Sequence, residues 1–215
     1  MEDPVEYTLP GVSHTQVRKH IGLDFLPALR SVMRHDPDCV FVGEVREREV
    51  MEFIFKIAIT GHLVVTSLHT MNAVASIQRL IDLTEEPFIL SSGLSAIVNK
   101  RLVRKLCKEC SGEEVELSDE EVNRIGLSVN SVKVAKGCTQ CNHTGYRGRV
   151  AVYEFLTLDK NLKDYIRKKD IQGLQSALAE HSHKSLKCKA IEEVEAGTTT
   201  LEEVIRLFGK LESEA

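Results

Sequence analysis

Apolar and polar positions along the first hundred residues predict helices that alternate with short strands. Between residues 24 and 34 the apolar side chains recur every three or four positions, as on one face of an amphipathic helix. Shorter runs of β-branched and aromatic residues between such segments are typical of buried strands. The predicted helices lie at 24–34, 47–59 and 72–83, and the predicted strands lie at 40–42 and 63–68. This alternation predicts an α/β fold with a mostly parallel sheet covered on both sides.

The pattern changes after Leu106, where cysteines and glycines replace the regular periodicity. Ser118 and Glu121 form a capping box that predicts a short helix ending at Gly126. A strand-like run follows at 150–156, and the remainder is helical in pattern, with a second capping box at Thr200 and Glu203. The sequence therefore predicts three parts: an α/β part at 1–106, a cysteine module at 107–148 and a helical region at 149–215.

Composition narrows the class of protein. The 215 residues include 28 Lys and Arg against 32 Asp and Glu, a net charge of −4, which argues against a general nucleic-acid coat protein. No apolar run approaches the roughly 18 residues that span a bilayer. The first residues, Met1 to Pro4, are acidic and do not resemble a signal peptide. We therefore expect a cytoplasmic protein, in which paired cysteines indicate metal or redox chemistry.

Two Cys-x-x-Cys pairs stand 27 residues apart. They comprise Cys107, Cys110, Cys138 and Cys141. Two such pairs supply four thiolates, which predicts a closed tetrahedral Zn²⁺ site with a structural role. The alternatives are buried free cysteines or a pair of redox sites. Cys39 and Cys188 stand alone, and we expect the first in a buried strand and the second on a helix face.

Acidic and imidazole side chains mark the ends of the predicted strands. Glu44 follows the strand at 40–42, and ligands of open α/β sheets bind at the carboxyl ends of strands. An acid there can hold Mg²⁺ through water or polarise an attacking water, although many strands end in Glu. His62 and His69 flank the next strand, about 23 Å apart if extended, so they do not share one metal ion. His69 is expected at the same edge as Glu44; the alternative is a pair of hydrogen-bonded polar residues at strand ends.

Arg30 and Arg34 lie one helical turn apart in the first predicted helix. Such a pair usually forms a solvated basic face. The alternative is contact with phosphate or with a neighbouring subunit, because the arginine fork binds phosphate with two hydrogen bonds.

The order of these landmarks resembles the ATPases that power type II secretion and type IV pilus assembly. The matching stretches are EDPVEY at 2–7, LRS to RHDPD at 29–38, VGEVRE at 42–47, TGHLVVTSLHT at 60–70, RLVRKLC at 101–107 and GYRGR at 145–149. The likeness covers nearly the whole chain. It implies a RecA-like P-loop NTPase core, the four-cysteine zinc module of the assembly and secretion branch, and a helical carboxyl-terminal part.

The resemblance also implies roles for individual residues. Glu2 falls in the family's Asp box, where the acid is implicated in activating water, and Glu44 falls in its Walker B strand near Mg²⁺ and the γ-phosphate of ATP. His62 and His69 match its His box, and the resemblance implies that both are catalytic, with His69 expected to sense or position the γ-phosphate. Binding of the nucleotide is assigned to Asp3, Arg30, Arg34 and Arg46. Family members form hexameric rings at the cytoplasmic face of the inner membrane, docked to a polytopic membrane protein.

One element of the family is missing from the sequence. No Gly-x-x-x-x-Gly-Lys-Ser/Thr occurs in the 215 residues, so the phosphate-binding P-loop is absent, and the chain looks like a carboxyl-terminal portion. The expected function is ATP hydrolysis by the complete motor, with the chain alone inactive. The alternative is a non-catalytic module or remnant that docks on ring subunits or membrane partners. A zinc-ribbon nucleic-acid binder, suggested by the basic run at 101–105, is disfavoured by the net charge and the few aromatic residues.

Overall fold

The computed structural model describes residues 1–180, 183–209 and 211, and these fall into two compact units. The first unit combines Met1–Ile97 with Leu156–Ser182, and the second combines Val98–Phe155 with His183–Ala215. The unit boundaries therefore differ from the expected divisions at 106 and 148. They fall inside two long strands, β3 (Ala96–Leu106) and β6 (Tyr146–Thr157), which pair with each other. Residues 149–215, expected to form one helical region, are divided between the two units.

The first unit contains the parallel strand pair and most of the helices. Its elements are α1 (Phe25–Val32), β1 (Cys39–Val42), α2 (Arg48–Ile59), β2 (Leu63–Thr66), α3 (Ala73–Leu83), α4 (Pro87–Gly93), α6 (Lys160–Lys168) and α7 (Ile171–Glu180). The three helices and two strands predicted in residues 24–83 are confirmed. Capping explains two of the helix starts, because Asp24 accepts a hydrogen bond from the backbone of Phe25 and Asn72 accepts one from Ala75.

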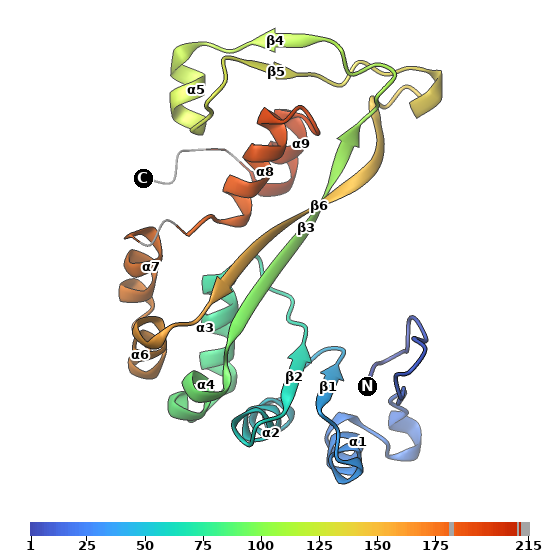
Figure 1. Cartoon of the computed structure of the whole chain (residues 1–215), viewed down its shortest axis with the longest axis vertical. Helices are drawn as coiled ribbons and strands as arrows, with labels where there is room; N and C mark the ends of the chain where they lie inside the picture. Colours follow the sequence, from blue (N-terminus) through green and yellow to red (C-terminus); the bar gives the residue numbers. More distant parts are fainter. Residues whose placement is uncertain (181–182, 210, 212–215) are drawn as a thin grey trace. The chain divides into compact units, whose positions relative to one another are not determined.

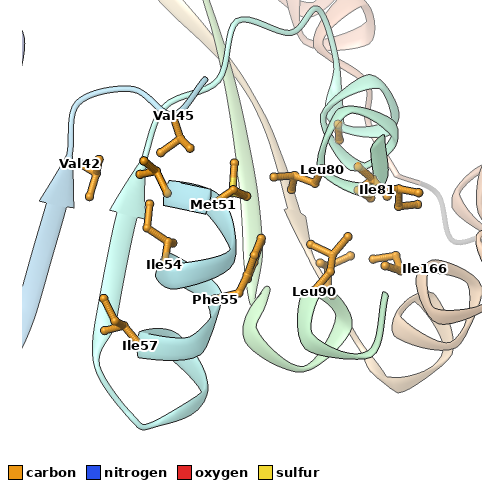
Figure 2. Close-up of a cluster of buried hydrophobic side chains, with 14 of the residues drawn as sticks. Val42, Val45, Met51, Ile54, Phe55, Ile57, Leu80, Ile81, Leu90 and Ile166 are labelled. Carbon is orange, nitrogen blue, oxygen red and sulfur yellow. The ribbon is translucent and has the colours of Figure 1, made fainter. Parts of the chain in front are cut away.

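Strands β1 and β2 run parallel, with Cys39 opposite Leu63 and Val42 opposite Thr66 (Figure 1). On one side of this pair, Val42 is fully buried and belongs to the same apolar cluster as Met51 and Ile54 of α2, which Figure 2 draws. This apolar core is the main source of stability for the unit.

The other side of the strand pair is exposed. Phe41, Leu63 and Val65 keep 45%, 61% and 46% of their surface accessible. The expectation of a sheet covered on both sides is therefore wrong for β1 and β2, and Cys39 is exposed rather than buried. Alternate residues of a strand point to opposite faces, and only one face of this strand pair is covered in the structure.

The first two residues lie along the edge of β1 that does not pair with β2. The amino group of Met1 donates to the carbonyl oxygen of Phe41 at 2.7 Å, and the N–H of Gly43 donates to the carbonyl oxygen of Met1 at 2.8 Å. On their opposite side, the N–H of Glu2 donates to the oxygen of Thr15 at 3.1 Å. The acid at position 2 is thus fixed beside the residue that precedes Glu44.

The second unit is built on the β3–β6 ribbon. Besides its share of the ribbon it contains β4 (Glu114–Glu116), α5 (Asp119–Ile125), β5 (Ser131–Lys133), α8 (Leu186–Glu195) and α9 (Leu201–Phe208). Its core joins Val103 of β3 and Val152 of β6 to Val194 and Val204 of the last two helices. No helix in the described residues of either unit has the length and apolar character needed to cross a bilayer.

The two predicted capping boxes have different outcomes. The box at the start of α5 is confirmed in full, because Ser118 and Glu121 bond each other's backbone N–H groups. At the start of α9, Thr200 accepts the N–H of Glu203 as predicted, but the Glu203 carboxylate turns instead to Arg104 and Arg206.

Candidate functional site

A carboxylate, an imidazole and a guanidinium meet where β1 and β2 end. The Glu44 carboxylate lies 3.1 Å from Nε2 of His69 and 2.8 Å from the guanidinium of Arg46. Parallel strands place their carboxyl ends at one edge, so Glu44 after β1 and His69 after β2 become neighbours. The shared edge predicted for these two residues is confirmed.

A hydrogen bond from the Ser67 side chain to the backbone helps to hold this arrangement. Its hydroxyl, at the end of β2, donates to the carbonyl oxygen of Gly43. The bond ties the residue before Glu44 to the segment that carries His69. Nothing in the local sequence pattern separates Ser67 from other strand-end serines, so its contribution appears only in the structure.

The electrostatics of the cluster keep the carboxylate ionised. The hydrogen bond with His69 lowers the pKa of Glu44, and Arg46 lowers it further against the opposing effect of desolvation. The His69 side chain is 82% exposed, whereas Glu44 is 25% exposed. An ionised carboxylate with one side facing solvent can accept hydrogen bonds from water or bind a cation through water.

Glu2 reaches the same edge from the amino-terminal segment. Its Cγ lies 3.2 Å from the point where a side chain on Gly43 would begin, so the absence of a side chain at Gly43 makes room for Glu2. A small pocket next to Glu44 is lined by Asp3, Glu44, Arg46, Lys19 and Phe25, among others. Lys19, which the sequence did not single out, brings a second cation to this pocket.

Three of the predicted site residues lie elsewhere in the first unit. His62 is at the amino end of β2, where its Nδ1 lies 3.2 Å from the Thr60 hydroxyl and 3.3 Å from the carbonyl oxygen of Ile57. Arg30 lies over the ring of Phe53 at 5.9 Å. Arg34 is exposed in the 3-10 turn that follows α1. The structure therefore brings Glu44, Arg46 and His69 into contact. It places Asp3 in the pocket with Glu44 and Arg46 and Glu2 against Gly43, and it leaves His62, Arg30 and Arg34 apart.

The four paired cysteines form a second candidate site, in the second unit. Their sulfur atoms all lie within 4.8 Å of one another. The separations are 3.9 Å for Cys107 to Cys138, 3.9 Å for Cys110 to Cys141 and 3.8 Å for Cys138 to Cys141. Tetrahedral zinc with Zn–S bonds of about 2.3 Å requires sulfur separations of about 3.8 Å. The donor set and its geometry therefore fit a tetrahedral metal ion.

Backbone groups favour the thiolate form of Cys141. Although burial acts to raise it, the N–H groups of Cys138 and Gly145, each 3.2 Å from the sulfur, lower the pKa of Cys141 to about 6. Gly145 has a φ of +77°, and a Cβ there would lie 2.6 Å from the side chain of Ala135. Only glycine meets both conditions, so this knuckle depends on Gly145.

Comparison with known proteins identifies the family. Residues 1–206 match the model of a family described as Type II/IV secretion system protein. The chain belongs to this family. It is 38% identical over 211 residues to Type II secretion system protein E of Aeromonas hydrophila, a match that covers 96% of this chain and 42% of that relative. It is also 38% identical over 211 residues to the Type IV pilus assembly ATPase PilB of Thermus thermophilus, covering 95% of this chain and 24% of PilB.

Solved structures show the same α/β fold. The pilus retraction motor PilT with bound ADP aligns with a TM-score of 0.69 and 25% identity, covering 97% of this chain and 51% of PilT. The ATPase DotB of Legionella pneumophila aligns with a TM-score of 0.65 at 17% identity, covering 95% of this chain and 49% of DotB. The resemblance to secretion and pilus assembly ATPases and the α/β fold class are thus confirmed. The chain spans less than half the length of the type II secretion relatives that it matches.

Proposed function

We propose that this chain provides the metal- and water-binding edge of an ATP-hydrolysing motor subunit for type II secretion or type IV pilus assembly. The observation that supports the proposal is the cluster of Glu44, His69 and Arg46 at the ends of two parallel strands, with Glu2 packed against the neighbouring Gly43. Phosphoryl transfer is accelerated mainly by positioning and by charge stabilisation, and this edge offers groups for both.

Each residue of the cluster has a distinct proposed role. Glu44 would hold Mg²⁺, His69 would donate to the γ-phosphate and Glu2 would activate the attacking water. Mg²⁺, when bound with ATP, neutralises the charge on the phosphates, and the ionised Glu44 fits that ion. Asp3 and Arg46, at the same pocket, contact the nucleotide.

The more distant arginines and histidine have other proposed roles. Arg30 and Arg34 are candidates for reaching the nucleotide of a neighbouring subunit in a homo-hexameric ring. His62 serves to fix the end of α2, as its contacts with Thr60 and Ile57 support.

The phosphate cradle must come from a segment outside these 215 residues. The sequence contains no P-loop, and Phe41, Leu63 and Val65 form an exposed apolar face. Parallel sheets are normally covered on both faces, so this face suits the helix that follows a P-loop. Among the described residues β2 pairs with β1 alone, which leaves its other edge free for a further parallel strand. We therefore propose that the chain alone neither binds ATP tightly nor hydrolyses it.

A chimera tests this function. The chain is fused to the preceding half of the Aeromonas hydrophila relative, and ATP binding is measured by calorimetry and hydrolysis by phosphate release. We expect hydrolysis from the chimera and none from the chain alone. Glu44→Gln should abolish hydrolysis, whereas Glu49→Gln, an exposed change on α2, should leave it intact. An inert but folded chimera would refute the motor proposal and favour the non-catalytic docking module.

For the cysteine cluster we propose structural Zn²⁺. All four thiolates are occupied in such a site, so no open position remains for a substrate. Metal analysis of freshly purified protein should give about one zinc per chain. A chelator should unfold the segment around 107–148 and leave the helices of the first unit folded. Purified protein without zinc would contradict the proposal.

The proposed place of the complete motor is the cytoplasmic face of the inner membrane, docked to the platform protein of its machine. Support comes from the relatives, which are named as components of secretion and pilus systems. No nucleic-acid partner is proposed, in keeping with the net charge of −4. Light scattering of the chimera with a non-hydrolysable ATP analogue tests the ring, and a gel-shift assay with DNA and RNA tests the absence of nucleic-acid binding.

A further inference from the structure

His14 lies beside Glu2 and has both of its ring nitrogens directed at defined partners. Its Nε2 accepts a hydrogen bond from the backbone N–H of Leu9 at 2.9 Å. Its Nδ1 lies 3.8 Å from Oε2 of Glu2. Both side chains are 19% exposed, so the pair is largely shielded from water.

The contact with Leu9 determines which nitrogen carries the proton. A neutral imidazole has one N–H donor and one acceptor nitrogen. Because the Leu9 N–H occupies the lone pair on Nε2, the proton of the neutral ring must sit on Nδ1. Nδ1 is the nitrogen that faces the Glu2 carboxylate, so the ring presents a donor to an acceptor.

The backbone explains why residue 14 reaches Glu2. The N–H of Glu2 donates to the oxygen of Thr15, and the N–H of Val17 donates to the oxygen of Glu2. These bonds form a parallel bridge between Glu2 and Gln16. The bridge fixes the backbone of the segment after His14, and the Leu9 bond fixes the far side of the ring.

We propose that His14 is a positioning residue for Glu2, which it orients through its Nδ1–H. The proposal rests on the proposed role of Glu2 in activating water. A shift of less than 1 Å would close the Nδ1 to Oε2 distance to a hydrogen bond, and catalytic hydrogen bonds are often long before substrate binds. One lone pair of the carboxylate would then be used by His14, and the other oxygen would be left for the attacking water.

The first test is spectroscopic and needs no activity. Long-range ¹H–¹⁵N spectra of the labelled 215-residue chain, recorded where imidazole is neutral, report the protonated nitrogen of each histidine. The His14 signals are assigned by their loss in His14→Gln. We expect a protonated Nδ1 and an unprotonated Nε2, with an Hδ1 proton that exchanges slowly and is lost to fast exchange in Glu2→Ala. The opposite tautomer, or an Hδ1 unaffected by Glu2→Ala, would overturn the proposal.

The second test uses the ATPase chimera. Glutamine at position 14 places an amide oxygen near the Nε2 position, so it preserves the acceptor for Leu9 but not the donor for Glu2. His14→Gln should lower kcat about tenfold or more without changing KM for ATP, because the loss falls on the water-activating acid. In a Glu2→Gln background the same change should have no further effect. His20→Gln, at an exposed histidine of the same segment, is the matched control.

The two tests separate failure of this proposal from failure of the proposed function. A chimera that does not hydrolyse ATP refutes the proposed function. The spectroscopic result then decides by itself whether His14 orients Glu2. A loss from His14→Gln of equal size in both backgrounds would show that His14 acts only on folding, and would overturn the positioning role.

Discussion

The buried carboxylate of Glu203 leads to a prediction about the free energy of unfolding, and its magnitude follows from the structure. Its side chain is fully buried at the start of α9, and its oxygens lie 2.6 Å from the guanidinium of Arg104 and 2.7 Å from that of Arg206. Burial acts to raise the pKa of Glu203, but the hydrogen bonds from Arg206 and Arg104 outweigh it and hold this pKa at about 2. Arg104 lies near the end of β3, so the carboxylate ties α9 to the strand that leads into Cys107.

The depressed pKa translates into a free energy of unfolding. A pKa of about 2 in place of the ordinary 4.5 corresponds to about 3 kcal/mol of stability at neutral pH. For a carboxyl whose pKa is lowered by folding, this contribution is present above pH 4.5 and is lost as the pH falls through 2. By pH 3 about 2 kcal/mol of it should be lost.

Urea unfolding followed by circular dichroism, at pH 7, 5, 4 and 3, tests this value. The difference in free energy of unfolding between the native chain and Glu203→Gln should shrink by about 2 kcal/mol from pH 7 to pH 3. Comparison with the variant cancels any other effect of acid that both proteins share, including loss of the proposed metal. Glu202→Gln, an exposed change on the same helix, should show no such pH dependence. A difference that stays constant with pH would refute the ion-pair reasoning.

Three further predictions concern the two candidate sites. Gly145→Ala should lower zinc occupancy and destabilise the second unit by several kcal/mol. Gly148 has a similar φ of +78° but open space around it, so Gly148→Ala should lower the free energy of unfolding by only about 1 kcal/mol; calorimetry with metal analysis compares the two variants. Ser67→Ala removes the hydroxyl bond at the end of β2 and should cost about 1 kcal/mol in thermal unfolding, and no loss would show that the bond is dispensable. Because His69 lowers the pKa of Glu44, His69→Ala should raise that pKa, which an NMR titration of the Glu44 carboxyl in the 215-residue chain measures; an unchanged pKa would contradict the pairing.

Local signals in the sequence were sufficient for the elements of the first unit up to residue 83. Asp24 and Asn72 cap helices whose apolar stripes face the core, and these are interactions between near neighbours in the chain. The cluster of four cysteines could be predicted equally well, because two residues between thiolates is a local geometric requirement of a metal site. The meeting of Glu44 with His69 also followed, since parallel strands end at one edge.

Other features depended on contacts between residues far apart in the chain. Strand β3 was not predicted, because its basic residues obscure the alternation that pairing with β6 stabilises. The exposure of Phe41 could not be seen in an apolar run, since such a run does not say how many faces of a sheet are covered.

The sequence by itself determined the chemistry available to this protein: which acids, imidazoles and thiolates it carries, and on which helices and strands most of them stand. The tertiary structure alone decided how these groups are oriented and charged. The tautomer expected for His14 and the lowered pKa values of Glu203 and Glu44 all arise from partners that folding supplies. The physical reason is that hydrogen bonds and electrostatic interactions depend on distances of a few ångströms, which spacing along the chain does not fix.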